Sequence, residues 1–294
     1  MTRAEHAAAW PHEDEALFLE AVRYTAAETG FAGRLVEKDY FASLVLAHLA
    51  QQNDHPLVFK GGTCLAKVHA DFFRLSEDLD FAIGMDASST RKQRQDRAKG
   101  FKGLLEWLVK RTPSLSTVEP LRGANESRQY LGVIGFESRL TRESQSIKFE
   151  VSLREPLLTH TVTGDARTIL LDPVSERPRL QPIQLACMSL SEAISEKCRA
   201  ALTRRDVAIR DFFDIDYIIR TRGFDLEDVA FVTLLRSKLA VDGNPPADLG
   251  DERLRSLREQ VQANLRPVLR PADFDAFDLD RAIERVTAVA SALE

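Results

Sequence analysis

Two acids separated by a single residue, Asp78 and Asp80, are the side chains of this sequence with the clearest chemical potential. They stand near the end of the stretch LVFKGGTCLAKVHADFFRLSEDLDFAI, which runs from Leu57 to Ile83. The stretch predicts an apolar strand, a Gly-Gly-Thr turn, a helix and a second strand. Side chains alternate between faces along a strand, so both carboxylates are expected on one face. Neighbouring carboxylates repel each other, and a divalent cation between them relieves that repulsion.

The turn Gly61-Gly62-Thr63, upstream of the acids, decides how they are interpreted. Asp-Leu-Asp alone would also fit an ordinary solvated strand edge. Glycine lets backbone N–H groups approach a phosphate closely, and the N-terminus of the following helix adds partial positive charge. A phosphate cradle beside two carboxylates favours metal-assisted phosphoryl or nucleotidyl transfer. The predicted metal is Mg²⁺, because it prefers carboxylates, waters and phosphate oxygens and the sequence has no clustered His or Cys.

Three motifs in this order, KGGTCLAK, RLSEDLDF and EKCRAALTRRDVAIRDFFDID, resemble the AbiEii/AbiGii nucleotidyltransferase toxins. This family is related to the polymerase-β-like superfamily and includes the MenT-type toxins. The resemblance covers roughly residues 36–219 and implies an α+β fold, with a polymerase-β-like mixed sheet flanked by helices and a C-terminal helical subdomain.

The resemblance also implies roles for residues around the turn. Asp78 and Asp80 would hold the metal, and Gly61, Gly62 and Thr63 would cradle the phosphates. Two further positions are predicted to bind the nucleotide: Lys67, four residues after Thr63, and Ser76, two residues before Asp78. His69 is expected on the helix surface, with stacking on the nucleotide as the alternative.

A third acid, Glu150, lies in the predicted strand IKFEVSLRE, on the face opposite to the apolar residues. If this strand lies beside Asp78 and Asp80, Glu150 becomes a third metal ligand and completes the acidic triad of polymerase-β-like transferases. An exposed strand face is the other interpretation.

The third motif contributes Lys197, Arg204 and Asp211, spaced seven residues apart. On one continuous helix, this spacing places all three on the same face. The family has catalytic residues in this pattern, so Lys197 would neutralise charge on the leaving pyrophosphate, and Asp211 would orient Lys197 or the acceptor. For Arg74 and Arg204 two roles stay open, phosphate binding and bracing of the carboxylates.

The remaining elements follow from periodicity and from turn residues. Helices are predicted over 11–30 and 35–52, a basic helix over 88–110, a loop over 112–127, strands over 128–140, 146–153, 168–171 and around 180, and helices from 184 onward. This pattern divides the chain into a nucleotidyltransferase domain over residues 1–182 and a helical subdomain over residues 183–294.

Composition limits the partners. The net charge is −5, from 40 basic and 45 acidic residues, so nucleic-acid binding would need a local cluster such as the basic helix, which otherwise is a solvated surface. Three cysteines without metal-ligand spacing fit a reducing cytosol. No apolar run approaches the roughly 20 residues of a membrane span. The polar N-terminus predicts no signal peptide, so a cytoplasmic protein is expected.

The family implies a toxin of a bacterial toxin–antitoxin or abortive-infection system. It would transfer a nucleotide from a nucleoside triphosphate to an acceptor, here the 3′ end of tRNA, and so block translation. A cognate antitoxin would be its partner. One alternative is a kinase or nucleotidylating enzyme acting on a protein hydroxyl. Another is a non-catalytic nucleotide-binding regulator, against which the carboxylate pair argues.

Overall fold

A seven-stranded mixed sheet forms the centre of the molecule, in the strand order β3-β4-β5-β2-β1-β7-β6. The computed structural model describes residues 10–52, 56–241 and 243–293, so the N-terminal stretch used for the signal-peptide prediction lies largely outside the described residues. The strands are β1 (Val58–Lys60), β2 (Leu79–Ala82), β3 (Leu115–Ala124), β4 (Gln129–Glu137), β5 (Ser144–Ser152), β6 (Val162–Ala166) and β7 (Ile183–Cys187). The pairs β2–β5 and β1–β7 are parallel, and the other neighbouring pairs are antiparallel.

The central strands β1, β2 and β5 separate apolar from charged side chains. Phe59, Phe81 and Phe149 contact one another across these strands, with ring centroids 5.4 and 4.9 Å apart, and all three are buried. Because side chains alternate along a strand, Asp80 and Glu150 are turned to the other face. The apolar rows anchor the sheet in the core and leave one charged row on the opposite face.

Helices α1 (Glu15–Thr29) and α2 (Gly33–Ala50) supply much of the apolar cover of the sheet. The Asp14 carboxylate accepts a hydrogen bond from the Leu17 N–H at the start of α1, and Gly30 ends the helix in the left-handed conformation with φ 76°. In α2, the Phe41 ring stacks on Phe136 of β4 with centroids 4.1 Å apart.

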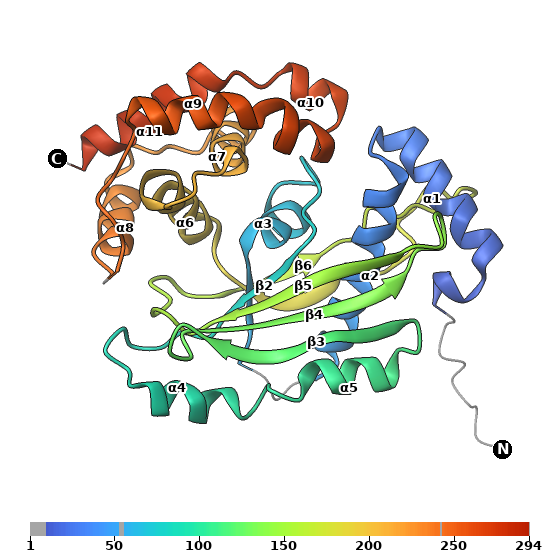
Figure 1. Cartoon of the computed structure of the whole chain (residues 1–294). Helices are drawn as coiled ribbons and strands as arrows, with labels where there is room; N and C mark the ends of the chain where they lie inside the picture. Colours follow the sequence, from blue (N-terminus) through green and yellow to red (C-terminus); the bar gives the residue numbers. More distant parts are fainter. Residues whose placement is uncertain (1–9, 53–55, 242, 294) are drawn as a thin grey trace.

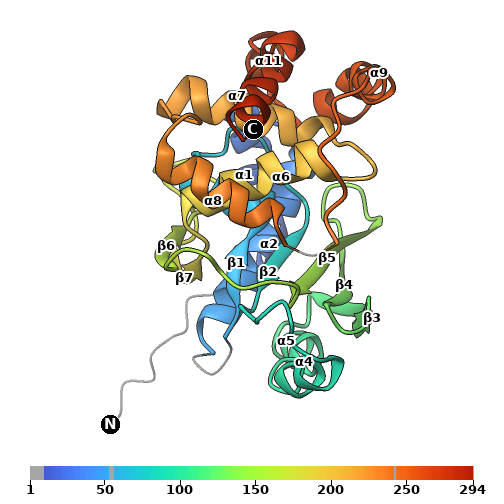
Figure 2. The same ribbon diagram turned by 90° about the vertical axis from the view of Figure 1, so that its left-hand side faces the viewer.

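The C-terminal helices gather around a second apolar core (Figures 1 and 2). They are α6 (Leu190–Thr203), α7 (Ile209–Arg222), α8 (Val229–Leu239), α9 (Asp251–Gln260), α10 (Pro271–Asp275) and α11 (Leu279–Ala292). The connection from β1 to β2, which begins with α3 (Gly61–Cys64), adds Leu65 and Phe73 to this core. In the described part of the chain, no helix is long and apolar enough to cross a bilayer.

Several sequence predictions of elements were wrong. The basic helix is two helices, α4 (Arg91–Ala98) and α5 (Leu104–Arg111), because glycines 100 and 103 interrupt it. The predicted loop over 112–127 is largely β3, an edge strand, where Pro120 breaks no necessary ladder bond. The predicted strand over 168–171 is absent from the described structure, and β6 precedes it instead.

The segment after residue 182 begins with a strand and not with a helix. β7 pairs in parallel with β1, so residues 183–187 belong to the sheet, and the first C-terminal helix starts at Leu190. Its alternating sequence IQLAC fits a strand, with Ile183, Leu185 and Cys187 buried. The division of the chain near residue 182 stays a prediction.

A buried ion pair joins α2 to the helix after the Gly-Gly-Thr turn. The Lys67 ammonium lies 2.6 Å from the Asp39 carboxylate, and the two side chains are 1% and 3% exposed. The same ammonium donates to the Ser43 hydroxyl at 2.7 Å and to the Arg167 carbonyl at 3.2 Å. The Lys67 ammonium is therefore buried and bound to partners inside the protein.

Replacing Lys67 with methionine is expected to lower the free energy of unfolding by about 3–5 kcal/mol, because Asp39 would stay buried without its cation. Urea denaturation measures the loss. The matched control is Lys99→Met, which breaks the exposed pair with Asp96 (side chains 75% and 51% exposed) and should change stability by less than about 1 kcal/mol. Equal losses in the two variants would contradict this account of Lys67.

Candidate active site

Three charged side chains form one row across the central strands. Lys60 of β1 lies opposite Asp80 of β2 in the antiparallel register, and Asp80 lies beside Glu150 of β5 in the parallel register. From the sequence, Glu150 is a candidate third ligand only if its strand lies beside the strand of Asp80. The structure meets this requirement, because β5 is the direct neighbour of β2. The Gln129 amide donates a hydrogen bond of 3.1 Å to the Glu150 carboxylate and orients it.

The surroundings of Asp80 disfavour its ionised form. Burial and the neighbouring Glu150, with a smaller contribution from Asp78, raise the pKa of Asp80 to about 6, although Lys60 and Lys197 act in the opposite direction. A carboxylate held at this cost favours a bound cation at neutral pH. Asp78 itself precedes β2, and its backbone carbonyl accepts a hydrogen bond from the Thr63 hydroxyl.

The glycines of the turn allow close approach of other side chains. Gly61 has φ +75°, and a Cβ placed on it would lie 2.2 Å from Asp80 Oδ2. A Cβ on Gly62 would lie 2.5 Å from Arg74 Nη2 and 3.0 Å from Ser76 Oγ. Any larger residue at either position would displace a charged group, Asp80 or Arg74. The positions of these two side chains therefore depend on glycine in the turn.

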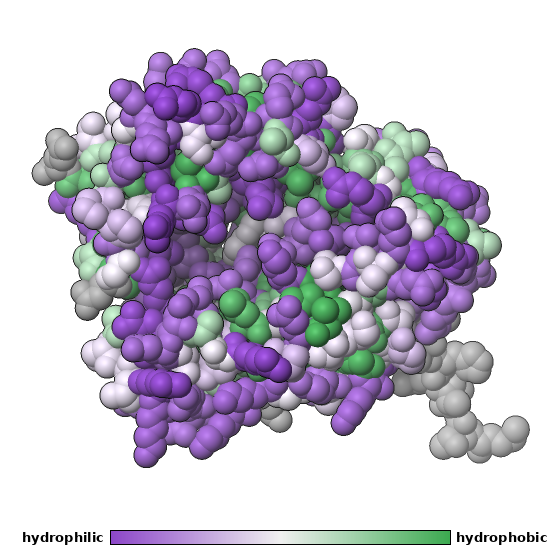
Figure 3. All heavy atoms as spheres, in the orientation of Figure 1, coloured by the Kyte–Doolittle hydropathy of each residue, from purple (hydrophilic) through white to green (hydrophobic). Residues whose placement is uncertain are grey.

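A polar cleft of about 530 Å³ opens between the charged row and the C-terminal helices (Figure 3). Lys60, Gly61, Asp80 and Glu150 line it from the sheet. The helical wall opposite contributes cationic side chains, which are Lys197, Arg199, Arg204 and Arg205. Two acids, Glu196 and Asp211, also belong to this wall, so Asp80 and Glu150 face a wall in which cationic side chains outnumber acidic ones.

Lys197 and Asp211 meet in this wall, although not on one continuous helix. The chain leaves the helical conformation after Thr203 and resumes it at Ile209, so Lys197 lies on α6 and Asp211 on α7. The Lys197 ammonium lies 2.8 Å from both Asp211 and Asp214. Burial lowers the pKa of Lys197, but the two carboxylates outweigh it, and the net shift is upward. These contacts therefore favour the protonated, cationic form of Lys197.

Arg74 braces this wall. Its guanidinium binds Asp214 in a bidentate manner, at 2.5 Å from Nε and 2.7 Å from Nη2, and both side chains are buried. Arg204 is 56% exposed and lies 3.4 Å from Asp211. Of the two roles left open for these arginines, the geometry favours bracing for Arg74.

Two side chains predicted to contact the nucleotide, Lys67 and Thr63, are engaged elsewhere, and the predicted contact of Ser76 stays a prediction. Lys67 points away from the cleft into its buried pair with Asp39, because the helix places it on the α2 side. The Thr63 hydroxyl is buried and occupied by the Asp78 carbonyl, while Ser76 is half-buried beside Gly62. His69, expected on the surface, is half-buried, and its Nε2 donates to the Met188 carbonyl at 3.0 Å.

The acids suit a magnesium ion that retains water ligands. Among residues 10–52, 56–241 and 243–293, no group of three or more His, Cys, Asp or Glu is arranged to hold a metal. Mg²⁺ commonly binds to one or two carboxylates and completes its shell with waters and substrate phosphates. Asp80 and Glu150 would fit that pattern, and metal binding by Asp78, Asp80 and Glu150 stays a prediction.

Sequence reasoning missed several cleft residues. Lys60 directly precedes the Gly-Gly-Thr turn. Alternation along the predicted strand could have indicated its position, because the residue after an inward-facing Phe59 faces the opposite side of the sheet. Its ammonium lies 2.7 Å from Glu196. Arg154, Arg199 and Asn244 come from three separate segments, and no local pattern connects them.

Solved structures of other proteins share this fold. The chain is similar to the crystal structure of JHP933 from Helicobacter pylori, with a TM-score of 0.52 and 16% identity over 90% of this chain and 93% of that one. It is also similar to MenT4, a nucleotidyltransferase toxin from Mycobacterium tuberculosis H37Rv, with a TM-score of 0.52 and 18% identity over 95% of this chain and 99% of that one. No curated protein matches the sequence.

The family follows from the sequence itself. Residues 44–288 match the model of the nucleotidyl transferase AbiEii toxin family of type IV toxin–antitoxin systems. The chain belongs to this family, and the resemblance inferred from its motifs is confirmed. The predicted α+β fold, a mixed sheet flanked by helices, is confirmed as well.

Replacing Asp80 with asparagine is expected to raise the free energy of unfolding in EDTA at pH 7, on the order of 1–3 kcal/mol. The pKa of Asp80 is higher in the folded protein than in the unfolded chain, so its ionised form disfavours folding. The advantage of the variant is full above about pH 6 and disappears as the pH falls toward the unfolded value near 4. Chemical denaturation across this range measures it.

Asp275→Asn, at an exposed position of α10, is the control and should stay within about 0.5 kcal/mol of the wild type. Mg²⁺ should raise the melting temperature of the wild type and not that of Asp80→Asn. A less stable Asp80→Asn protein would show that Asp80 is not strained by its neighbours.

Proposed function

We propose that this chain transfers a nucleotidyl group from a nucleoside triphosphate to the 3′ end of tRNA, in a Mg²⁺-dependent reaction that blocks translation. The observation that carries the proposal is the adjacency of Asp80 and Glu150 on β2 and β5, facing a cleft whose opposite wall holds Lys197. A cognate antitoxin as partner and a cytoplasmic location belong to the same proposal.

The reaction joins the acceptor hydroxyl oxygen to the α-phosphorus of the nucleotide. The bond from that phosphorus to the bridging oxygen breaks, pyrophosphate leaves, and the hydroxyl proton is released to solvent. Mg²⁺, held by Asp80 and Glu150 with Asp78 as the expected third acid, would neutralise the phosphates and make the hydroxyl a better nucleophile. Gln129 keeps the Glu150 carboxylate oriented toward the cleft.

Lys197 suits the charge that develops on the leaving pyrophosphate. Its two carboxylate partners keep it protonated and hold its position without removing it from the cleft surface. Preorganised cations stabilise developing charge without reorganisation at the moment of reaction. In this role Asp211 positions Lys197, as the sequence suggested.

Exposed basic side chains beside the sheet support an RNA acceptor. Arg91, Lys92 and Arg97 of α4 are exposed, as is Lys99 directly after it, whereas Arg94 is buried and donates to backbone carbonyls. A cluster of this kind neutralises backbone phosphates and makes binding sensitive to salt.

Incubation with Mg²⁺, total tRNA and each nucleoside triphosphate labelled at the α-phosphate is expected to place label on tRNA. Glu150→Gln should lower the rate at least about a hundredfold, because it removes charge from the metal-binding pair. Glu259→Gln, at an exposed position of α9, is the control and should leave the rate unchanged. Label on protein would contradict the tRNA proposal. In a parallel incubation with nucleotides labelled at the γ-phosphate, transfer of label would instead indicate a kinase.

A further inference from the structure

Not every cation in the cleft has a carboxylate partner. Lys60 is neutralised by Glu196 at 2.7 Å, and Lys197 by Asp211 and Asp214 at 2.8 Å. Arg154 differs from both, because within the described ranges it forms no ion pair. A half-buried guanidinium that lines a cleft and lacks a carboxylate partner carries charge available to an anion.

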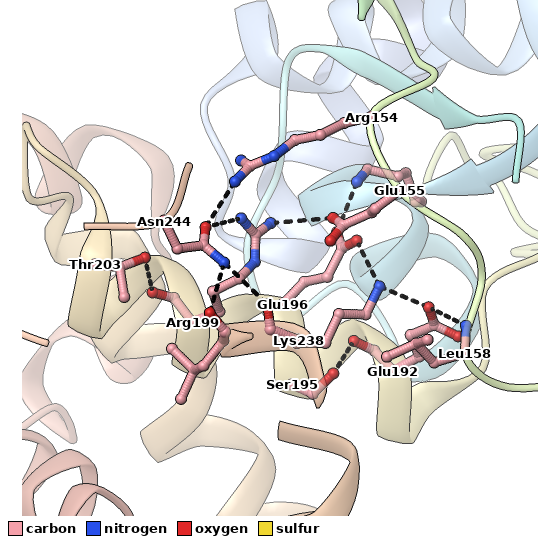
Figure 4. Close-up of polar contacts among 12 residues, drawn as sticks. Arg154, Glu155, Leu158, Glu192, Ser195, Glu196, Arg199, Thr203, Lys238 and Asn244 are labelled. Atoms are coloured by element: carbon pink, nitrogen blue, oxygen red, sulfur yellow. Dashed lines mark hydrogen bonds and ion pairs between the residues drawn. The ribbon is translucent and has the colours of Figure 1, made fainter. Parts of the chain in front are cut away.

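A neutral amide holds this guanidinium in place (Figure 4). The Asn244 side-chain oxygen accepts hydrogen bonds from Arg154 Nη2 at 2.7 Å and from Arg199 Nη1 at 3.2 Å. The Asn244 amide nitrogen donates to the Lys238 and Leu239 carbonyls, at 2.9 and 3.2 Å. The amide is therefore fixed by the end of α8, and its oxygen draws two arginines together.

Two guanidiniums on one uncharged acceptor repel each other. Arg199 has a carboxylate neighbour, Glu155, but only at 3.6 Å. Burial and the positive charge of Arg199 lower the pKa of Arg154, although the carboxylates of Glu155 and Glu196 act in the opposite direction. A phosphate group bound between the two forks would offset this repulsion and meet the bidentate geometry that arginine offers to phosphate.

The position of this pair relative to the acids decides which phosphate it would meet. Gly61 follows Lys60, which lies opposite Asp80, so the Gly-Gly-Thr turn lies before Asp80 in the direction of β2. Arg154 follows β5, which runs parallel to β2 and ends at Ser152, so it lies beyond Glu150 in the same direction. The acids thus lie between the glycine turn and the arginine pair.

In phosphoryl transfer the attacking and leaving oxygens are roughly in line on opposite sides of the phosphorus. If the triphosphate tail lies at the glycine turn, the acceptor must approach from the opposite side, where Arg154 and Arg199 lie. We propose that Arg154 and Arg199, positioned by Asn244, bind a backbone phosphate of the nucleic-acid acceptor close to its reacting 3′ end. This inference rests on the proposed function, because it takes RNA as the acceptor.

Equilibrium binding of total tRNA at several salt concentrations tests the site without requiring transfer. Arg154→Gln is expected to weaken tRNA binding about tenfold and to reduce the slope of log affinity against log salt by about 1, as for one lost phosphate contact. Asn244→Asp should act in the same direction while both arginines remain, because a carboxylate would neutralise them. Arg255→Gln, exposed on α9, is the matched control and should change neither quantity.

The kinetic split separates this site from the triphosphate site. In Arg154→Gln the KM for tRNA should rise about tenfold, and the KM for the nucleotide should stay within about twofold. A rise in the nucleotide KM alone would assign the pair to the triphosphate and overturn the proposal.

Unchanged tRNA affinity and salt slope in both variants would also overturn it, even if the wild type labels tRNA and the proposed function stands. Arginine-dependent tRNA binding without any transfer would uphold the site while the proposed reaction fails, and arginine-dependent labelling of a protein acceptor would overturn the RNA assignment.

Discussion

The structure depends on keeping two carboxylates side by side on neighbouring strands. Asp80 and Glu150 are register partners, and the pKa of Asp80, raised to about 6, measures how poorly the site tolerates both charges. The sheet compensates from the third strand, where Lys60 lies opposite Asp80. Lys60 in turn is bound to Glu196 of α6, so the compensation of the acids already reaches into the C-terminal helices.

The same helices are fixed to the sheet side by a chain of ion pairs. Arg74, from the connection between β1 and β2, binds Asp214 of α7, which also holds Lys197 of α6. Because these groups are buried or nearly so, losing one partner would leave another charge uncompensated. Phe73, next to Arg74, stacks on Phe213 with centroids 5.8 Å apart, so apolar and ionic contacts attach the connection between β1 and β2 to the C-terminal helices at one place. The wall of the cleft therefore keeps a defined position opposite the acids.

Sequence reasoning reached the acids because their signals are local or periodic. The alternation in IKFEVSLRE placed Glu150 on the face away from the core, and the family motifs identified Lys197 and Asp211. It failed where tertiary contacts override composition. β3 carries glycine, proline and serine yet pairs along β4, and β7 is too short to be recognised against the helical sequence that follows. Lys67 lies one helical turn from Thr63 as expected, but it forms an ion pair with Asp39 of α2. No feature of the motif predicts this partner.

Gly61 is required both by the backbone conformation after β1 and by the position of the Asp80 carboxylate. Its positive φ lets the chain reverse directly after Lys60, and the missing side chain leaves room for the Asp80 carboxylate. A methyl group there would meet that carboxylate at 2.2 Å, too close for both to keep their places. The glycine turn would therefore be required even if it bound no phosphate, since it is what allows β1 and β2 to bring Lys60 and Asp80 together at the floor of the cleft. A glycine pattern that suggests phosphate binding from sequence is, in this chain, first of all the condition for the acidic site to exist.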